Sequence, residues 1–96
     1  MIGSFADGAT EALFHGERGK KVRRLPPEIH STALRKLDML NAATELRDLR
    51  APPGNRLEAL RGDLEGRHSI RVNDQWRIVF RWESDDAHDV EIVDYH

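Results

Sequence analysis

The stretch 67–96, RHSIRVNDQWRIVFRWESDDAHDVEIVDYH, predicts three consecutive β-strands. Apolar and polar residues alternate over 68–72 and again over 76–82, which is the period of a half-buried strand. A third apolar run follows at 90–94. Short polar runs of Asn, Asp and Ser separate the three segments and are typical of turns. The stretch therefore predicts an antiparallel sheet around which the rest of the chain is organised.

The two faces of this predicted sheet differ in chemistry. One face carries large apolar side chains, including Trp76 and Trp82, and the other carries arginines. The last strand runs directly into Asp94-Tyr95-His96. An arginine-bearing face that ends in a carboxylate, a phenol and an imidazole indicates phosphate chemistry.

The residues before this stretch predict one more strand and two helices. Met1 to Phe5 is a short apolar segment that is a candidate edge strand of the sheet. Asp7 is placed to cap a first helix, and Gly16 is a natural end for it. Pro26-Pro27 precedes the longest predicted helix, at about 28–43.

An apolar stripe on this longer helix predicts which side packs on the sheet. The stripe is expected to be core, whereas Lys36 and its charged neighbours Arg35 and Asp38 are expected to face elsewhere. A strand at 57–60 opens the late sheet. The order of elements predicts one α+β domain over 1–96, with an antiparallel sheet and two N-terminal helices packed on one face. The stripe residues are Ile29, Ala33, Leu37 and Leu40.

Composition restricts the class of protein. The chain has 96 residues, 33% of them charged, and a net charge of -2. This balance disfavours a protein that neutralises a long stretch of nucleic-acid backbone, but it is compatible with a local patch of arginines. It has no cysteine, which excludes disulfides and thiolate chemistry and fits a reducing compartment. The opening residues lack the long apolar run of a signal peptide, and no segment reaches membrane-spanning length. A cytoplasmic protein is therefore expected.

Metal and nucleotide-cofactor chemistry both fit the sequence poorly. The five histidines include no close pair at ligand spacing, and no cysteine accompanies them, so a structural zinc site is not expected. There is no glycine-rich phosphate loop and no nucleophile turn of the Gly-x-Ser-x-Gly type. We therefore expect neither a metal nor a cofactor.

Metal-independent phosphodiester cleavage needs few groups. A base removes a proton from a ribose 2'-hydroxyl, an acid protonates the leaving oxygen, and a cation holds the phosphate. His96 can be the acid or the base, and Glu58 is a candidate second proton carrier. Arg77 and Arg61 can donate two hydrogen bonds each to a phosphate. Tyr95 can stack on a base or donate its hydroxyl.

Each of these residues also has a purely structural interpretation. A terminal histidine is commonly a frayed end, and Asp94 can simply balance an arginine. Arg77 can pair with Glu91 or Glu83 across the sheet. The basic segment 17–24 can be a solvated loop instead of an RNA-contacting arm. The pattern of residue types alone does not choose between the two interpretations.

Three stretches carry a resemblance to a known family. These are PPGNRLEALRGD at 52–63, HSIRVNDQWRIVFRW at 68–82 and VEIVDYH at 90–96. They resemble HigB toxins of the RelE/ParE toxin-antitoxin superfamily, including the GraT-like branch. The segments MIGSF, TEALF and the helix segment 35–50 are similar too, so the resemblance covers nearly the whole chain.

The resemblance implies a compact RelE-like fold of the microbial RNase type and a metal-independent endonuclease that cuts mRNA in the A site of the 70S ribosome. Such a toxin inhibits translation and growth without a cofactor. It implies neutralisation by a helix-turn-helix antitoxin of the HigA type, with operator DNA bound only through that antitoxin. No membrane partner is implied.

The resemblance also assigns residues. Asp94, Tyr95 and His96 match the terminal catalytic group of the family, and Arg77 matches the arginine that stabilises the scissile phosphate. Arg61 matches a basic residue that many members fill with lysine. The remaining residues expected to bind RNA or phosphate are Arg71, Arg81, Lys20, Lys21, Arg23 and Arg24.

Glu58 departs from the family pattern, because some HigB proteins have histidine there. An unperturbed glutamic acid, with a pKa of about 4.3, is a poor acid at neutral pH. The division of proton roles between Glu58 and His96 is therefore open, and weaker cleavage than in histidine-bearing members is one hypothesis.

Two other functions are compatible with the same resemblance. A ParE-like relative would inhibit DNA gyrase by binding and would not cleave RNA. A degenerate toxin would act only as an antitoxin partner and co-repressor. Truncation of Asp94-Tyr95-His96 separates these from a nuclease, because a binding toxin does not need those groups.

Overall fold

A computed structural model describes residues 1–94 of the chain. Tyr95 and His96, two of the predicted catalytic residues, lie outside the described residues.

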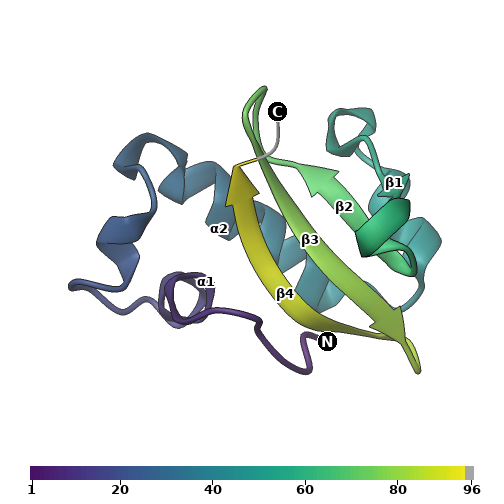
Figure 1. Cartoon of the computed structure of the whole chain (residues 1–96), viewed down its shortest axis with the longest axis horizontal. Coiled ribbons are helices and arrows are strands. Elements are labelled where there is room, and N and C mark those ends of the chain that lie inside the picture. The colour runs from purple at the N-terminus through teal and green to yellow at the C-terminus, as the bar shows by residue number, and fades with distance from the viewer. Residues whose placement is uncertain (95–96) are drawn as a thin grey trace.

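Four antiparallel strands form one sheet in the order β1-β2-β3-β4, which confirms the predicted fold class (Figure 1). The strands are β1 Glu58–Ala59, β2 Arg67–Arg71, β3 Trp76–Glu83 and β4 Asp86–Asp94. The last strand begins earlier than the predicted position 90, because Ser84 and Asp85 take positive φ angles of 53° and 64° and close a two-residue hairpin turn.

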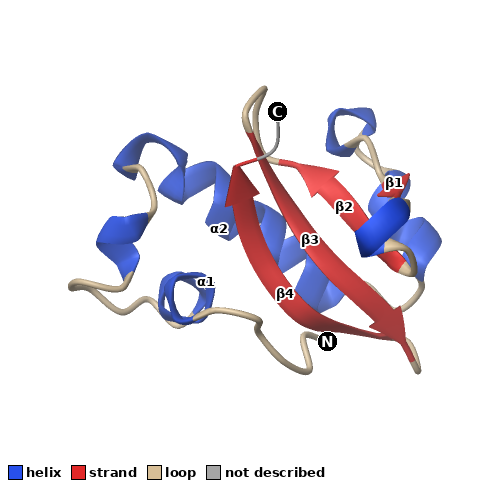
Figure 2. Ribbon diagram, viewed as in Figure 1, coloured by secondary structure: helices blue, strands red, loops and turns tan. Residues whose placement is uncertain are grey.

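Within residues 1–94, two α-helices and four short 3₁₀ segments accompany the sheet (Figure 2). Helix α1 spans Gly8–Phe14, and the Asp7 carboxylate caps it by accepting from the Thr10 amide at 2.8 Å, as predicted. Helix α2 spans Pro27–Ala42, with Pro27 in its first turn. The 3₁₀ segments are η1 Val22–Arg24, η2 Leu46–Arg50, η3 Pro53–Asn55 and η4 Gly62–Leu64.

The core lies between α2 and one face of the sheet, while α1 sits beside the β4 edge (Figure 1). The predicted apolar stripe of α2 is buried, and Leu37 and Leu40 are fully inaccessible. One prediction for this helix is wrong. Lys36, expected to face away from the core, is only 6% exposed. The opposing strand residues of the core are Ile70, Ile78, Phe80, Val90 and Ile92.

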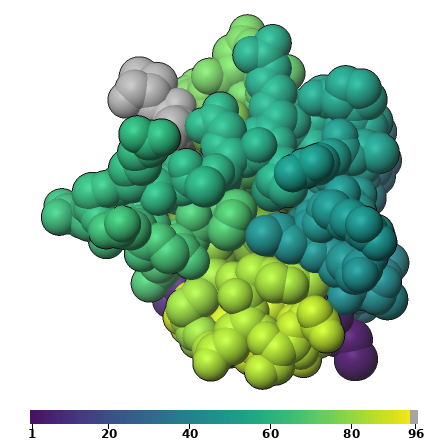
Figure 3. All heavy atoms as spheres, turned by 90° about the vertical axis from the view of Figure 1, so that its right-hand side faces the viewer, coloured from purple at the N-terminus to yellow at the C-terminus, as the bar shows by residue number. Residues whose placement is uncertain are grey.

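The opposite face of the sheet is less open than the arginine pattern predicts. Ser69, Arg77 and Val79 on that face are all buried. Figure 3 views the molecule from the side of β1 and shows the teal and green segments between α2 and β2 gathered around that edge of the sheet. Arg56 and Glu58 of this region contact Arg77 directly.

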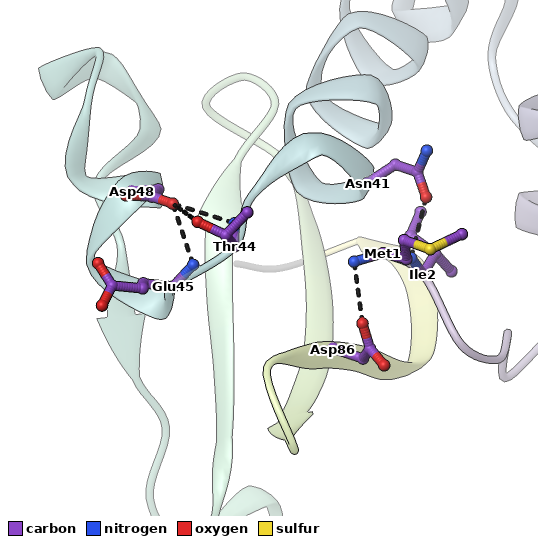
Figure 4. Close-up of polar contacts among 7 residues, drawn as sticks. All are labelled: Met1, Ile2, Asn41, Thr44, Glu45, Asp48 and Asp86. Carbon is purple, nitrogen blue, oxygen red and sulfur yellow. Dashed lines mark hydrogen bonds and ion pairs between the residues drawn. The ribbon is translucent and has the colours of Figure 1, made fainter.

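The N-terminal residues join the other edge of the sheet in a reduced form of the predicted strand. Ile2 and Phe5 make isolated parallel bridges to Ala87 and Val90 of β4 and do not form a continuous strand. The Ile2 amide also donates to the Asn41 side chain near the end of α2, at 3.0 Å (Figure 4). The same figure shows Asp48 accepting from the amides of Thr44 and Glu45, which fixes the start of η2.

Candidate functional site

Arg77 is the most firmly held charged side chain of the candidate site. Its Nε donates to the Ser69 hydroxyl at 2.8 Å, and its Nη2 donates to the Arg56 carbonyl at 2.7 Å. Its side chain is 9% exposed. A buried guanidinium held at two of its nitrogens has one orientation, which suits it to bind an anion at a fixed position.

Glu58 lies next to this guanidinium. Its Oε1 is 3.8 Å from Arg77 Nη1, and its side chain is half exposed. Glu58 pairs in register with Ser69, so the two residues share the sheet face of Arg77. The structure therefore brings Glu58 and Arg77 together and leaves the carboxylate open to solvent. Glu83, one of the two acids expected to pair with Arg77 in the structural interpretation, pairs with Arg81 instead.

Arg71 adds a second positive charge at the same place. It is the register partner of Arg77 on the neighbouring strand, so the two side chains leave the backbone at directly opposite positions on one face of the sheet. Arg71 is bound to the exposed Asp74 carboxylate in the turn that follows. Like charges placed opposite each other are unfavourable unless acids or a ligand offset them. This end of the sheet is therefore an electropositive site flanked by Asp74 and Glu58.

Asp94 is at the same end of the sheet but on the other face. It pairs in register with Trp76, whereas Arg77 pairs with Val93, and consecutive strand residues point to opposite faces. Gln75 Nε2 donates to Asp94 Oδ2 at 3.0 Å. Asp94 also lines a cavity of about 300 Å³ with Trp76 and Arg24. Arg77 and Asp94 therefore lie on opposite faces at the same end of the sheet.

Arg81 and Arg61 do not join this group. Arg81 is four residues along β3 from Arg77, about 13 Å away at the usual strand rise. Its Nε donates to Asp89 at 3.2 Å, and Glu83 binds its Nη1. The Asp89 hydrogen bond, together with Glu83, raises the pKa of Arg81. Arg61 follows the backbone contact between Leu60 and Arg67, which places it toward the Arg81 end. The predicted phosphate-binding arginines are thus split between two ends of the sheet.

The basic segment forms a separate surface on the α1 side of the molecule. Arg23 and Arg24 lie in η1, and the buried side chain of Val22 anchors that turn. Lys20 and Lys21 precede it and line a small cavity of about 140 Å³. Of these four cations, Arg24 shares the cavity with Asp94. Figure 1 shows this segment on the opposite side of α1 from β1 and β2.

Two groups that position Arg77 were not predicted from the sequence. Ser69 is 0% exposed and accepts from Arg77, but strand alternation predicts only a polar residue on the outer face. The Arg56 carbonyl is a backbone group, so no side-chain pattern could identify it. The sequence signal that does exist is Asn55-Arg56 after Pro52-Pro53-Gly54, which marks a rigid loop just before β1.

Within residues 1–94, His, Asp and Glu side chains do not gather into a group of three or more able to hold a metal ion. In the same residues, none of the helices has the length and apolar character needed to cross a membrane.

The fold and the sequence together identify the class of protein. Residues 3–96 match the model of the HigB-like toxin family, described as the RelE-like toxin of the type II toxin-antitoxin system HigB. The chain therefore has the fold of a RelE-like toxin, and toxins of type II systems are paired with an antitoxin. More narrowly, it belongs to the HigB-like toxin family.

Individual relatives agree with this assignment. The chain is 50% identical over 82 residues to "Toxin HigB-1" of Vibrio cholerae serotype O1, an alignment that covers 85% of this chain and 84% of the relative. It is 33% identical over 96 residues to "Endoribonuclease HigB" of Proteus vulgaris, with both chains covered completely. A solved YoeB-YefM complex from Staphylococcus aureus contains a chain that superposes with a TM-score of 0.61 at 12% identity, covering 100% of this chain and 98% of that one, which establishes the fold alone.

Proposed function

We propose that this toxin is a ribosome-dependent mRNA endonuclease that cleaves by attack of the ribose 2'-hydroxyl on the adjacent phosphate. The observation that supports it best is the orientation of Arg77, fixed by Ser69 and Arg56 beside a second arginine, at the end of the sheet where the chain continues to Tyr95 and His96. The name "Endoribonuclease HigB" carried by a full-length relative supports the same activity.

In this mechanism Arg77 binds the scissile phosphate and stabilises the charge that develops on it. His96 is the main acid-base group, and Asp94 orients it. Tyr95 positions the nucleotide by stacking. Arg71 adds positive charge beside Arg77, and its pairing with Asp74 keeps it in place when no RNA is bound. The products are a 2',3'-cyclic phosphate and a 5'-hydroxyl.

Glu58 has two roles open to it in the proposed mechanism. Its carboxylate lies close enough to Arg77 to offset the guanidinium charge, and it is exposed enough to accept a proton from the 2'-hydroxyl. As a base it would act at the start of the reaction, while His96 would protonate the leaving oxygen. In this division, Glu58 is the only base and His96 is the only acid of the reaction.

Substrate positioning comes largely from the ribosome. We infer that the toxin acts in the A site of the 70S ribosome, where mRNA and ribosome hold the reacting groups in line and so supply much of the rate enhancement. The basic residues Lys20, Lys21, Arg23 and Arg24 would contact ribosomal RNA. We further infer a cytoplasmic location, a HigA-type helix-turn-helix antitoxin as the specific partner, and contact with operator DNA only through it.

The test is primer-extension mapping of a translated mRNA on purified ribosomes, with the wild type and a chain that lacks Tyr95 and His96. Ribosome-dependent cuts that disappear in the truncated chain are the expected result. Cuts that persist would move the chemistry to Glu58 and the arginines. Growth arrest without any cuts would contradict the nuclease and favour binding to DNA gyrase.

A further inference from the structure

The longest helix contains a buried cation that the apolar stripe does not explain. Lys36 is 6% exposed, and its ammonium donates to the Asn55 side-chain oxygen. Burial lowers the pKa of Lys36, and the charges of Arg35 and Arg71 lower it further. Removing an ammonium from water is costly unless a partner compensates, and a neutral residue of the same length would avoid that cost. The contact with Asn55 is therefore what compensates the buried ammonium of Lys36.

Asn55 is itself completely buried and connects three parts of the chain. Its Oδ1 accepts from Lys36 of α2. Its Nδ2 donates to the Leu49 carbonyl of η2 at 3.2 Å and to the Ala51 carbonyl at 3.3 Å. One amide thus fixes the loop before β1 against both helical segments, and the acceptor and donor sides of the amide are each used.

The next residue is held in an unfavourable backbone conformation. Arg56 has φ 45° and ψ 57°, in the left-handed region that is unfavourable for a residue other than glycine. In this conformation the Arg56 carbonyl accepts from Arg77 Nη2 at 2.7 Å. Since Asn55 and Arg56 are consecutive, whatever fixes the Asn55 side chain also fixes the position of that carbonyl.

We propose that Lys36 and Asn55 are positioning residues for Arg77, acting through the Arg56 carbonyl. Lys36 holds Asn55, Asn55 holds the loop, and the loop holds the guanidinium that binds the scissile phosphate. This inference rests on the proposed role of Arg77 in RNA cleavage. Lys36 is buried on helix α2 and bound to Asn55, so its proposed role is positioning and not catalysis.

A double-mutant cycle between Lys36→Met and Arg77→Ala tests the proposal on ribosomes. Lys36→Met keeps the chain length and removes the ammonium. We expect kcat to fall about 10- to 100-fold, since small misplacements of a catalytic group have effects of this size, while KM changes about twofold or less. The double variant should be no slower than Arg77→Ala alone, because Lys36 acts only through Arg77. The matched control is Arg35→Met, which removes a charge from an exposed position of the same helix.

A second readout does not depend on cleavage. The Arg77 Nε–H donates to Ser69 in a buried position, so its NMR signal should exchange slowly with water in the wild type. In Lys36→Met that signal should shift and exchange faster, and in Arg35→Met it should not. The exchange rate of the Arg77 signal tests the positioning role even if the wild type cuts no RNA. A failure of the proposed cleavage activity can therefore be distinguished from a failure of the positioning role.

Two results would overturn the inference. One is a loss of kcat in Lys36→Met that multiplies with the loss in Arg77→Ala, which would mean that Lys36 supports only the general stability of the fold. The other is an Arg77 signal that is the same in both single variants. If Lys36→Met does not fold, the milder Lys36→Gln is judged by the same measurements.

Discussion

Arg77 is buried even though it occupies a position that alternates with core residues along β3. Period-two alternation correctly places it on the face opposite Ile78 and Phe80. Alternation along β3 does not reveal that Arg56 and Glu58 contact Arg77, because the short segment that contains them has no periodic pattern of its own. The face of the sheet on which Arg77 lies was therefore predictable from the sequence, and the contacts that orient its side chain were not.

The role of Glu58 can be tested by replacing it with histidine, the residue that some HigB proteins have in that strand. Glu58→His should raise the ribosome-dependent cleavage rate at pH 7, because an imidazole can exchange a proton near neutral pH. Glu58→Gln, which keeps the size and removes the base, should lower it by about 100-fold or more if the carboxylate is the general base. Single-turnover primer extension measures both. Equal rates in the wild type and Glu58→His would argue against attenuation by this residue.

His68 should make the stability of the fold depend on pH. Its ring stacks on Phe80 with centroids 6.2 Å apart, and its Nδ1 is buried without a hydrogen-bond partner among residues 1–94. Burial lowers the pKa of His68 in the folded state. The unfolded chain therefore binds the proton more readily, so the free energy of unfolding falls as the pH is lowered through the ordinary histidine pKa of about 6.5.

The measurement is urea unfolding of the wild type and His68→Gln at pH 7.5 and pH 5. The wild type should lose more stability between the two values than the variant does, since the other titrating groups are common to both. The same loss in both proteins would show that another group carries the pH dependence.

At the scale of elements, a buried side-chain hydroxyl links α1 to the β4 edge. Thr10 is 0% exposed, and its Oγ1 accepts from the Ile92 amide at 2.9 Å. A valine has the same shape but no acceptor, so Thr10→Val leaves a buried amide unsatisfied at a cost of about 1–3 kcal/mol. For a domain of this size each kcal/mol lowers Tm by about 4–8 °C.

Thr10→Ser is the matched control for this prediction, because it keeps the acceptor and loses one methyl group. It should cost about 1 kcal/mol or less. Thermal unfolding followed by circular dichroism compares the two variants. A Thr10→Val protein as stable as the wild type would show that the Ile92 amide finds water when α1 is altered.

Element positions were predicted best where periodicity or a cap is explicit. The three late strands, the Asp7 cap and the proline start of α2 are confirmed. The N-terminal segment was less predictable, because only Ile2 and Phe5 of it form bridges. The bulge between Val79 and Arg81 was also not predicted, and it follows from a positive φ of 52° at Asp89, the residue that binds Arg81. An aspartate within a strand segment does not by itself predict a positive φ angle.

At the scale of the whole molecule, the positive groups form two separate surfaces. The site around Arg77 lies at one end of the sheet, and the basic segment lies on the α1 side. The net charge of -2 hides both of them, because acids elsewhere balance the cations. This separation predicts different kinetic effects for substitutions on the two surfaces.

Replacing Lys20, Lys21 and Arg23 with glutamine should weaken binding to the ribosome without changing the chemical step. KM should rise, and the slope of log KM against log salt concentration should become shallower by about 1 for each phosphate that the variant no longer neutralises. The control replaces Arg47 and Arg50 on η2, which line a different cavity from Lys20 and Lys21. Cleavage assays over a series of KCl concentrations measure both. An unchanged salt slope in the variant would mean that the basic segment is only a solvated loop.

The pairing of the first residues with β4 sets the order in which the fold can be completed during synthesis. The bond between Ser4 and Asp89 joins residues 85 positions apart, and the bond between Thr10 and Ile92 joins residues 82 apart. On a translating ribosome, the first residues therefore emerge long before their partners exist, and the edge of the sheet stays unformed until β4 has left the exit tunnel. The topology therefore delays completion of the sheet edge until synthesis of the last strand is over.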